Sequence, residues 1–151
     1  MILKNEDMLR EVVINIMTEM FFIFPDMDDE GLPLDKKEAT SDFMDVMIHF
    51  HAENQLHFRI EYGMLREMAA NFLGLMPEEV DEDNLKAAAL ETANIIGGNF
   101  LVEIDPDKEF SLSIPAIVKK DDCLPQEERQ WSISFVSDDS AIIIWPQPRT
   151  Q

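Results

Sequence analysis

Apolar residues along the chain recur at two different spacings, and each spacing predicts one kind of element. Before Pro25 they recur three and four positions apart, as on one face of a helix, at Met8, Leu9, Val12, Val13, Ile16, Met17, Met20 and Phe21. Pro25 predicts the end of this helix. An acidic loop at 26–30, leading to Gly31 and Pro33, is expected to follow it.

Between positions 43 and 62 the spacing becomes two, which predicts strands with one apolar face. A three-residue turn at Glu53-Asn54-Gln55 would join two strands into a hairpin. In that hairpin Phe50 would lie opposite Phe58, and Ile48 opposite Ile60.

Two amphipathic helices are expected next. The first runs from Leu65 to Leu73 and is stopped by Gly74. The acidic connector 77–83 leads to the second helix, which Asn84 or Asp83 can cap and which runs to about Leu101.

The rest of the chain predicts a strand and a second hairpin. Phe110, Leu112 and Ile114 alternate as a strand that Pro115 ends. Residues 131–137 and 140–145 alternate around the turn 138–139. The expected register pairs Ile133 with Ile144 and Phe135 with Ile142.

Each half of the chain therefore puts a long helix before an antiparallel hairpin, which suggests an internal duplication. We expect an α+β fold in which helices pack on an antiparallel sheet. The length of 151 residues fits a single domain over 1–151, large enough to bury a core without disulfides.

Charge and composition then exclude several classes. Acidic residues outnumber basic ones 31 to 12, and a net charge of -19 opposes binding to nucleic acid or to an anionic membrane surface. Cys123 is the single cysteine, so an intrachain disulfide cannot form. No apolar run approaches the ~18 residues of a membrane helix, and no signal peptide is recognised. A cytoplasmic protein is expected.

The helix from Asn84 to Leu101 carries the main functional signal. On a wheel of ~100° per residue its core side consists of Leu85, Ala89, Thr92, Ile96 and Phe100. Nearly opposite lies a stripe of Ala87, Glu91, Asn94 and Gly98. Glu91 and Asn94 point out together, and the small Ala87 and Gly98 leave room for another backbone. The alternative is that Glu91 and Asn94 are ordinary solvent-facing residues, because E-x-x-N is a short match.

The sequence around this stripe is more specific. Glu91 and Asn94 lie in ALETANIIGGNF, residues 89–100, and 20 residues separate Asn94 from Pro115, the end of FSLSIP at 110–115. This resembles the CheC/CheX/FliY phosphatases of bacterial chemotaxis, in which an E-x-x-N helix precedes a short strand ending in Pro. The helix, Gly and acidic connector at 65–80 resemble the family as well. The resemblance implies a CheC-like fold.

Two departures from the family pattern matter. Ala87 stands where the family often has Asp or Ser, which removes a polar contact to a partner. In the first helix Glu11 is followed by Ile14, and Glu19 by Phe22, so a second E-x-x-N is missing. With one motif, on the second long helix, the chain is similar to CheX.

The resemblance implies a phosphorylated CheY-like receiver as partner and substrate. The receiver supplies the aspartyl phosphate, Mg²⁺ and a Lys, and lacks only a positioned water. Asn94 would align that water, and Glu91 would pair with the receiver's Lys. The chain would need no metal or cofactor of its own.

Two other functions stay open. The fold can serve as a non-catalytic receiver-binding module, as Ala87 would allow. Alternatively, His49, His51 and His57 share the polar face of the first hairpin, with His51 opposite His57, as a three-His zinc site would require.

A homodimer is expected as well, as the resemblance to CheX implies. The outer face of the second hairpin carries Val136, Ile143 and Trp145, which would be exposed beside an open strand edge. Pairing that edge with a symmetry mate would cover them. The competing explanation is that the helix 65–73 covers this face within one chain.

Overall fold

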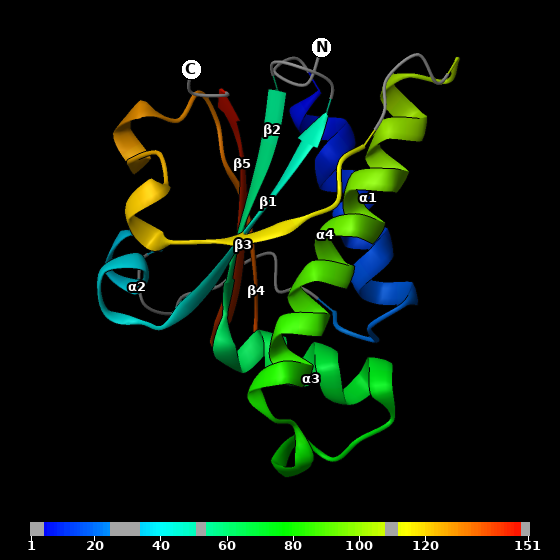
Figure 1. Cartoon of the computed structure of the whole chain (residues 1–151), viewed down its shortest axis with the longest axis vertical. Coiled ribbons are helices and arrows are strands. Elements are labelled where there is room, and N and C mark those ends of the chain that lie inside the picture. The colour runs from blue at the N-terminus through cyan, green and yellow to red at the C-terminus, as the bar shows by residue number, and fades with distance from the viewer. Residues whose placement is uncertain (1–4, 25–33, 51–53, 108–111, 149–151) are drawn as a thin grey trace.

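A computed structural model describes residues 5–24, 34–50, 54–107 and 112–148 (Figure 1). The helices are α1 (Glu6–Glu19), α2 (Leu34–Thr40), α3 (Tyr62–Leu73) and α4 (Glu82–Ile104), with 3-10 turns η2 (Pro77–Glu79), η3 (Lys120–Asp122) and η4 (Gln126–Glu128). The strands are β1 (Phe43–Phe50), β2 (Asn54–Glu61), β3 (Ala116–Val118), β4 (Ile133–Ser137) and β5 (Ser140–Pro148). Of these helices, α2 was not predicted from the sequence.

The strands form one antiparallel sheet in the order β3-β1-β2-β5-β4. The hairpins β1–β2 and β5–β4 meet where β2 pairs with β5, so the two halves of the chain lie side by side in the sheet. Helices α1, α3 and α4 cover one face (Figure 1). The predicted α+β fold with helices on an antiparallel sheet is confirmed.

The core lies between the sheet and these three helices. Alternate residues of β1 and β2 point into it, which places Val46, Ile48, Leu56, Phe58 and Ile60 out of contact with solvent. The predicted core side of α4 is buried against them. Among the described helices, none combines the length and the apolar character that crossing a membrane requires.

The register of the first hairpin differs from the prediction. Phe50 pairs with Asn54 and Ile48 with Leu56, because β1 ends at Phe50 and β2 begins at Asn54, so the connection lies two residues earlier than predicted. The predicted pairs Phe50–Phe58 and Ile48–Ile60 are therefore wrong. The shift is an even number of residues, so every apolar side chain keeps its predicted face. The other predicted turn residue, Glu53, lies outside the described residues.

The ends of the two middle helices show what the sequence can and cannot locate. Gly74 ends α3 in the left-handed conformation, at φ 70°, as predicted. The predicted cap of α4 is wrong, because Asp81 is the N-cap. Its carboxylate accepts from the Asn84 backbone N–H at 2.8 Å, and Asn84 Oδ1 accepts from the Asp81 N–H at 3.0 Å. This reciprocal pair starts the helix at Glu82.

The strand predicted before Pro115 is wrong as well. Within the described residues, Leu112 makes a single bridge to Phe50, and the strand β3 starts only after Pro115. Pro115 has no backbone N–H for a ladder bond, so it precedes the strand rather than ending it. Phe110 and the acidic loop at 26–30 lie outside the described residues. The second hairpin has the predicted register, Ile133 with Ile144 and Phe135 with Ile142.

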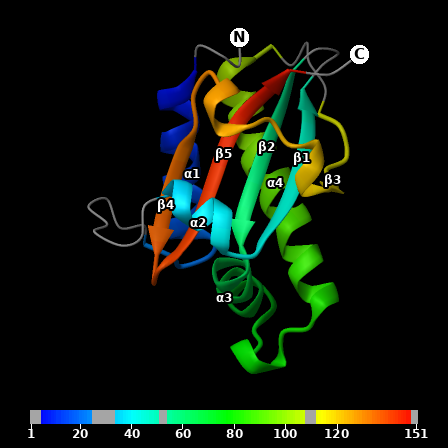
Figure 2. The ribbon, with the colours of Figure 1, turned by 90° about the vertical axis from the view of Figure 1, so that its left-hand side faces the viewer.

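The second face of the sheet is covered too. Helix α2 and the segment 119–130, which contains η3 and η4, lie across it (Figure 2). Val136, Ile143 and Trp145 are only 8%, 2% and 0% exposed. The predicted exposed apolar patch is therefore wrong. Its alternative, cover by the helix 65–73, is wrong as well, since α3 belongs to the opposite layer (Figure 2).

Buried charges hold this cover in place. Glu38 of α2 accepts hydrogen bonds from Arg59 Nη1 of β2 at 2.8 Å and from Arg129 Nη2 at 3.0 Å. Arg59 Nε donates to Asp45 Oδ1 at 2.8 Å. The Arg129 guanidinium lies 3.5 Å from the centre of a Trp145 ring. Each of these buried charges has an opposite charge beside it, as burial requires.

His57 completes this cluster as a neutral side chain. Its ring stacks on Trp145 with centroids 4.2 Å apart, and Nε2 lies 2.7 Å from Asp45 Oδ1. Burial lowers the pKa of His57, although the hydrogen bond to Asp45 opposes this. Burial would raise the pKa of Asp45, but hydrogen bonds from His57 and Arg59 hold it below the usual value. A neutral ring with its proton on Nε2 leaves Nδ1, which has no hydrogen-bond partner among the described residues, as a bare acceptor.

The lowered pKa of His57 predicts a loss of stability in mild acid. The unfolded chain takes up a proton near pH 6.5, whereas folded His57 takes one up only at lower pH, so the free energy of unfolding falls as the pH drops below 6.5. The slope of this contribution is at most ~1.4 kcal/mol per pH unit. The His57→Gln variant, whose amide can still donate to Asp45, should lose this component. Urea unfolding between pH 7.5 and pH 5 measures it, and equal slopes for both proteins would contradict a neutral His57.

Candidate functional site on α4

Helix α4 has a buried and an exposed side. Among the residues of the predicted stripe, Ala87 and Asn94 are exposed, while Glu91 and Gly98 are partly exposed. Glu91 and Asn94 are three positions apart, so their side chains are neighbours on the helix surface. The structure thus brings the four predicted site residues together on the side of α4 that faces away from the core.

A groove of about 340 Å³ runs along this side of the helix. One wall comes from α4 and the other from the segment 112–115 before β3. Its lining residues are Ala87, Leu90, Glu91, Asn94, Leu112, Ser113, Ile114 and Pro115. The segment that ends at Pro115, with 20 residues between Asn94 and that proline, therefore lies directly across the groove from Asn94. Gly98 does not line this groove.

Backbone bonds to β1 fix the second wall. The Ser113 N–H donates to the His49 carbonyl at 3.0 Å, and the His49 N–H donates to Ser113 Oγ at 2.9 Å. Leu112 bridges to Phe50, and β3 continues the pairing with β1 from Ala116. Paired backbone of this kind holds its side chains in place better than a free loop does.

The two adjacent glycines of α4 have different surroundings. A Cβ at Gly97 would lie 3.2 Å from Ile48 Cδ1 and 3.5 Å from Leu112 Cδ1, so the helix packs closely on β1 and on the groove's second wall at this point. A Cβ at Gly98 would meet no atom within 4 Å. Packing within the chain explains Gly97. It does not explain Gly98.

The groove offers few chemical groups. Glu91 supplies one carboxylate and Asn94 one amide, whereas the Ser113 hydroxyl is held by the backbone of His49. A hydrolase that acts alone needs an acid and a base, or a nucleophile with a base beside it. The described lining residues offer neither combination. They can orient water and accept a bond from a cation.

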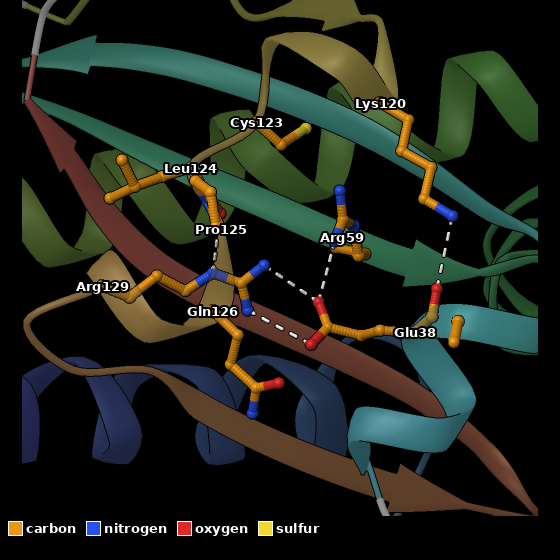
Figure 3. Close-up of a pocket in the computed structure, with 9 residues that line it drawn as sticks. Glu38, Arg59, Lys120, Cys123, Leu124, Pro125, Gln126 and Arg129 are labelled. Atoms are coloured by element: carbon orange, nitrogen blue, oxygen red, sulfur yellow. Dashed lines mark hydrogen bonds and ion pairs between the residues drawn. The ribbon is translucent and has the colours of Figure 1, made fainter.

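A second cavity, of about 350 Å³, lies on the other face of the sheet (Figure 3). Arg59 and Arg129 point at the Glu38 carboxylate from two sides, and Lys120 Nζ donates to the Glu38 carbonyl at 3.3 Å (Figure 3). Sequence analysis missed this cluster. Two of its charged residues, Asp45 and Arg59, stand between the apolar ones of the first hairpin, where the sequence alone does not show whether water or another charge satisfies them.

This cluster also changes the question of a metal site. His51 lies outside the described residues, and the register pairs His57 with Met47 rather than with His51. The ligand atoms of Asp45, His57 and Cys123 do lie within 4.8 Å of one another. However, Arg59 already donates to the same Asp45 oxygen as His57, and burial raises the pKa of the Cys123 thiol to about 12. A protonated thiol and a paired carboxylate suit a hydrogen-bonded network better than a metal.

Cys123 is not placed as a nucleophile either. Its Sγ lies 3.3 Å from His57 Nε2, the same nitrogen that contacts Asp45. In a thiol-activating triad the carboxylate binds one ring nitrogen and leaves the other for the nucleophile. Here both groups compete for one nitrogen, so the thiol is not activated.

Comparison with known structures supports the fold. CheX from Vibrio vulnificus shares 14% identity with a TM-score of 0.68, and the match covers 95% of each chain. A CheC-like protein from a Shewanella species shares 19% sequence identity with a TM-score of 0.61, and the match covers 92% of this chain and 94% of the other. CheX from Borrelia burgdorferi was solved as a complex with CheY, BeF3 and Mg²⁺. It shares 16% sequence identity with a TM-score of 0.65, and the match covers 95% of this chain and 97% of the other.

Sequence comparison identifies the family. Among curated proteins, none matches this chain significantly. The family described as "Chemotaxis phosphatase CheX" matches residues 45–136, which is more than half of the chain. The matched region includes all of α4 and the segment 112–115 across the groove. This chain therefore belongs to the CheX family of chemotaxis phosphatases.

Proposed function

We propose that this protein hydrolyses the aspartyl phosphate of a CheY-like receiver, in chemotaxis or related two-component signalling. One observation carries the proposal. In a chain of the CheX family, Glu91 and Asn94 share an open groove whose other wall is the segment ending at Pro115. The solved complex of a structurally similar CheX with CheY supports a receiver as the partner.

Asn94 is proposed to align the attacking water. Its side chain is exposed and reaches the groove from a helix that is packed against the sheet. An amide can donate to and accept from one water, and it carries no negative charge to repel the phosphoryl group. Water attacks phosphorus, the bond to the aspartyl oxygen breaks, and free carboxylate and inorganic phosphate leave. Positioning of this kind supplies much of the catalysis in phosphoryl transfer.

Glu91 is proposed to dock the receiver by pairing with its Lys. The carboxylate is only partly exposed, and a charge-assisted bond to an ammonium group is stronger there than on an open surface. Ala87 and Gly98 flank the pair with little side chain, which lets the receiver's backbone come close. Mg²⁺ would come with the receiver, and this chain would hold no cofactor of its own.

A second candidate is a receiver-binding module without catalysis. Ala87 favours it, because the family often has Asp or Ser at this position and the methyl group of Ala cannot make that polar contact. The intact pair Glu91 and Asn94 favours the phosphatase. Phosphate release from a panel of phosphorylated receivers, with and without this protein, distinguishes the two.

Replacing Asn94 tests the proposed catalytic role. Asn94→Ala should lower the rate of phosphate release by roughly 100-fold or more while the receiver still binds, because the amide acts on water rather than on docking. Glu91→Ala should weaken binding as well as rate. Asn99→Ala is the matched control, since Asn99 is an exposed amide of the same helix that does not line the groove. Full activity of Asn94→Ala would refute the assignment.

Gly98 offers a test in which stability and function change in opposite directions. Gly98→Ala should raise the free energy of unfolding by about 0.5–1 kcal/mol, because Ala is the better helix former and its Cβ meets nothing. The same Cβ should weaken receiver binding. Thermal unfolding and a binding titration measure both effects. Unchanged binding would remove Gly98 from the proposed contact surface.

We also propose a homodimer, although Val136, Ile143 and Trp145 are buried within the chain and cannot form its interface. What supports it is the position of β4 and β3 at the two edges of the described sheet, where backbone groups can pair with a second chain. Sedimentation at moderate salt should give twice the 17.4 kDa chain mass. A monomer at high micromolar concentration would exclude a stable dimer.

A further inference from the structure

Ile114 is the most exposed of the large apolar side chains in the described part of the chain, at 89%. It stands in the segment 112–115 and lines the same groove as Glu91 and Asn94. Leu112, two residues before it, also lines the groove but packs against the position of Gly97 and the core. The segment thus has one apolar residue that packs within the chain and one that does not.

The exposure of Ile114 is not that of a free loop. Ser113, immediately before it, exchanges two hydrogen bonds with the backbone of His49, and Pro115, immediately after it, has a fixed φ angle. The strand β3 then pairs with β1. Because its neighbours are fixed on both sides, little conformational freedom is lost when a partner covers the side chain.

We propose that Ile114 is the apolar residue of this chain that anchors a bound receiver. Its contact with the receiver sets the binding affinity and helps to discriminate among receivers. This inference rests on the proposed function, which supplies the partner. Any protein that brings a phosphoryl group to Asn94 must enter the groove, and Ile114 forms part of its wall. An apolar side chain of the receiver, beside its phosphorylation site, would then cover the side chain of Ile114.

Charge explains why an apolar anchor is needed. The chain carries a net charge of -19, and the acyl phosphate that it would approach is an anion. Repulsion between them opposes the encounter, whereas the pair formed by Glu91 and the receiver's Lys favours it. Burial of an apolar side chain does not depend on salt in this way.

The test uses receiver proteins encoded in the same genome, each in its beryllofluoride-activated form for binding and phosphorylated for turnover. Ile114→Ser should raise both Kd and KM about tenfold and leave kcat within about twofold, at low and at high salt. Ile114→Leu should restore binding. Phe22→Ser is the matched control, because Phe22 is also exposed, at 66%, but follows α1 and does not line the groove.

Each outcome decides one proposal. Unchanged Kd and KM for Ile114→Ser, or an equal loss for Phe22→Ser, would overturn the anchor while leaving the phosphatase intact. Wild-type protein that binds a receiver but releases no phosphate would overturn the phosphatase, and the Kd values would still test the anchor. If no receiver binds the wild-type protein, both proposals are wrong.

Discussion

The close approach of α4 to β1 at Gly97 is the constraint on which the rest of the site depends. A side chain there would meet Ile48 and Leu112, so helix, sheet and groove wall come together at one backbone position. Glycine inside a helix costs up to about 1 kcal/mol relative to Ala, and the dispersion energy of close packing offsets that cost. Because the inner side of α4 is fixed against β1, the direction of its outer side is fixed as well. Glu91 and Asn94 therefore face the groove before any partner arrives.

The two faces of the sheet are covered by different means. The helices on one face bury apolar side chains, whose packing tolerates small changes of angle and register. On the other face, Glu38 binds Arg59 and Arg129, and such bonds require one geometry. Buried ion pairs often add little net stability, but losing one partner leaves the others uncompensated. This network fixes α2 and the segment 119–130 on the sheet. It also keeps the apolar side chains of that face, such as Trp145, out of reach of a second chain.

Sequence analysis located those features that local physics determines. The helix end at Gly74 and the turn Asp138-Asp139 follow from backbone conformations that few residues adopt easily, and the outward stripe of α4 follows from helical spacing. The buried cluster on the sheet face covered by α2 and the segment 119–130 depends on contacts between residues far apart in the chain, such as Glu38 with Arg129. Alternation alone predicted a polar face and not a buried cluster, because a charged residue in a strand looks the same whether water or another charge satisfies it. The position of Ile114 across from Asn94 required the pairing of the segment with β1, which spacing does not reveal.

Under the proposed function, the small number of chemical groups in the groove is a consequence of the division of labour between two proteins. The receiver holds the phosphoryl group, the metal ion and the leaving carboxylate, so general acid–base groups in the groove would add little. What remains is to place one water and to hold the receiver's acyl phosphate against this acidic chain long enough for the water to react. The amide of Asn94 suits the first task because it is neutral and fixed on a packed helix. The second task needs attraction that survives the net charge of -19, which Glu91 alone does not supply, and this is the physical reason for an exposed apolar residue beside it.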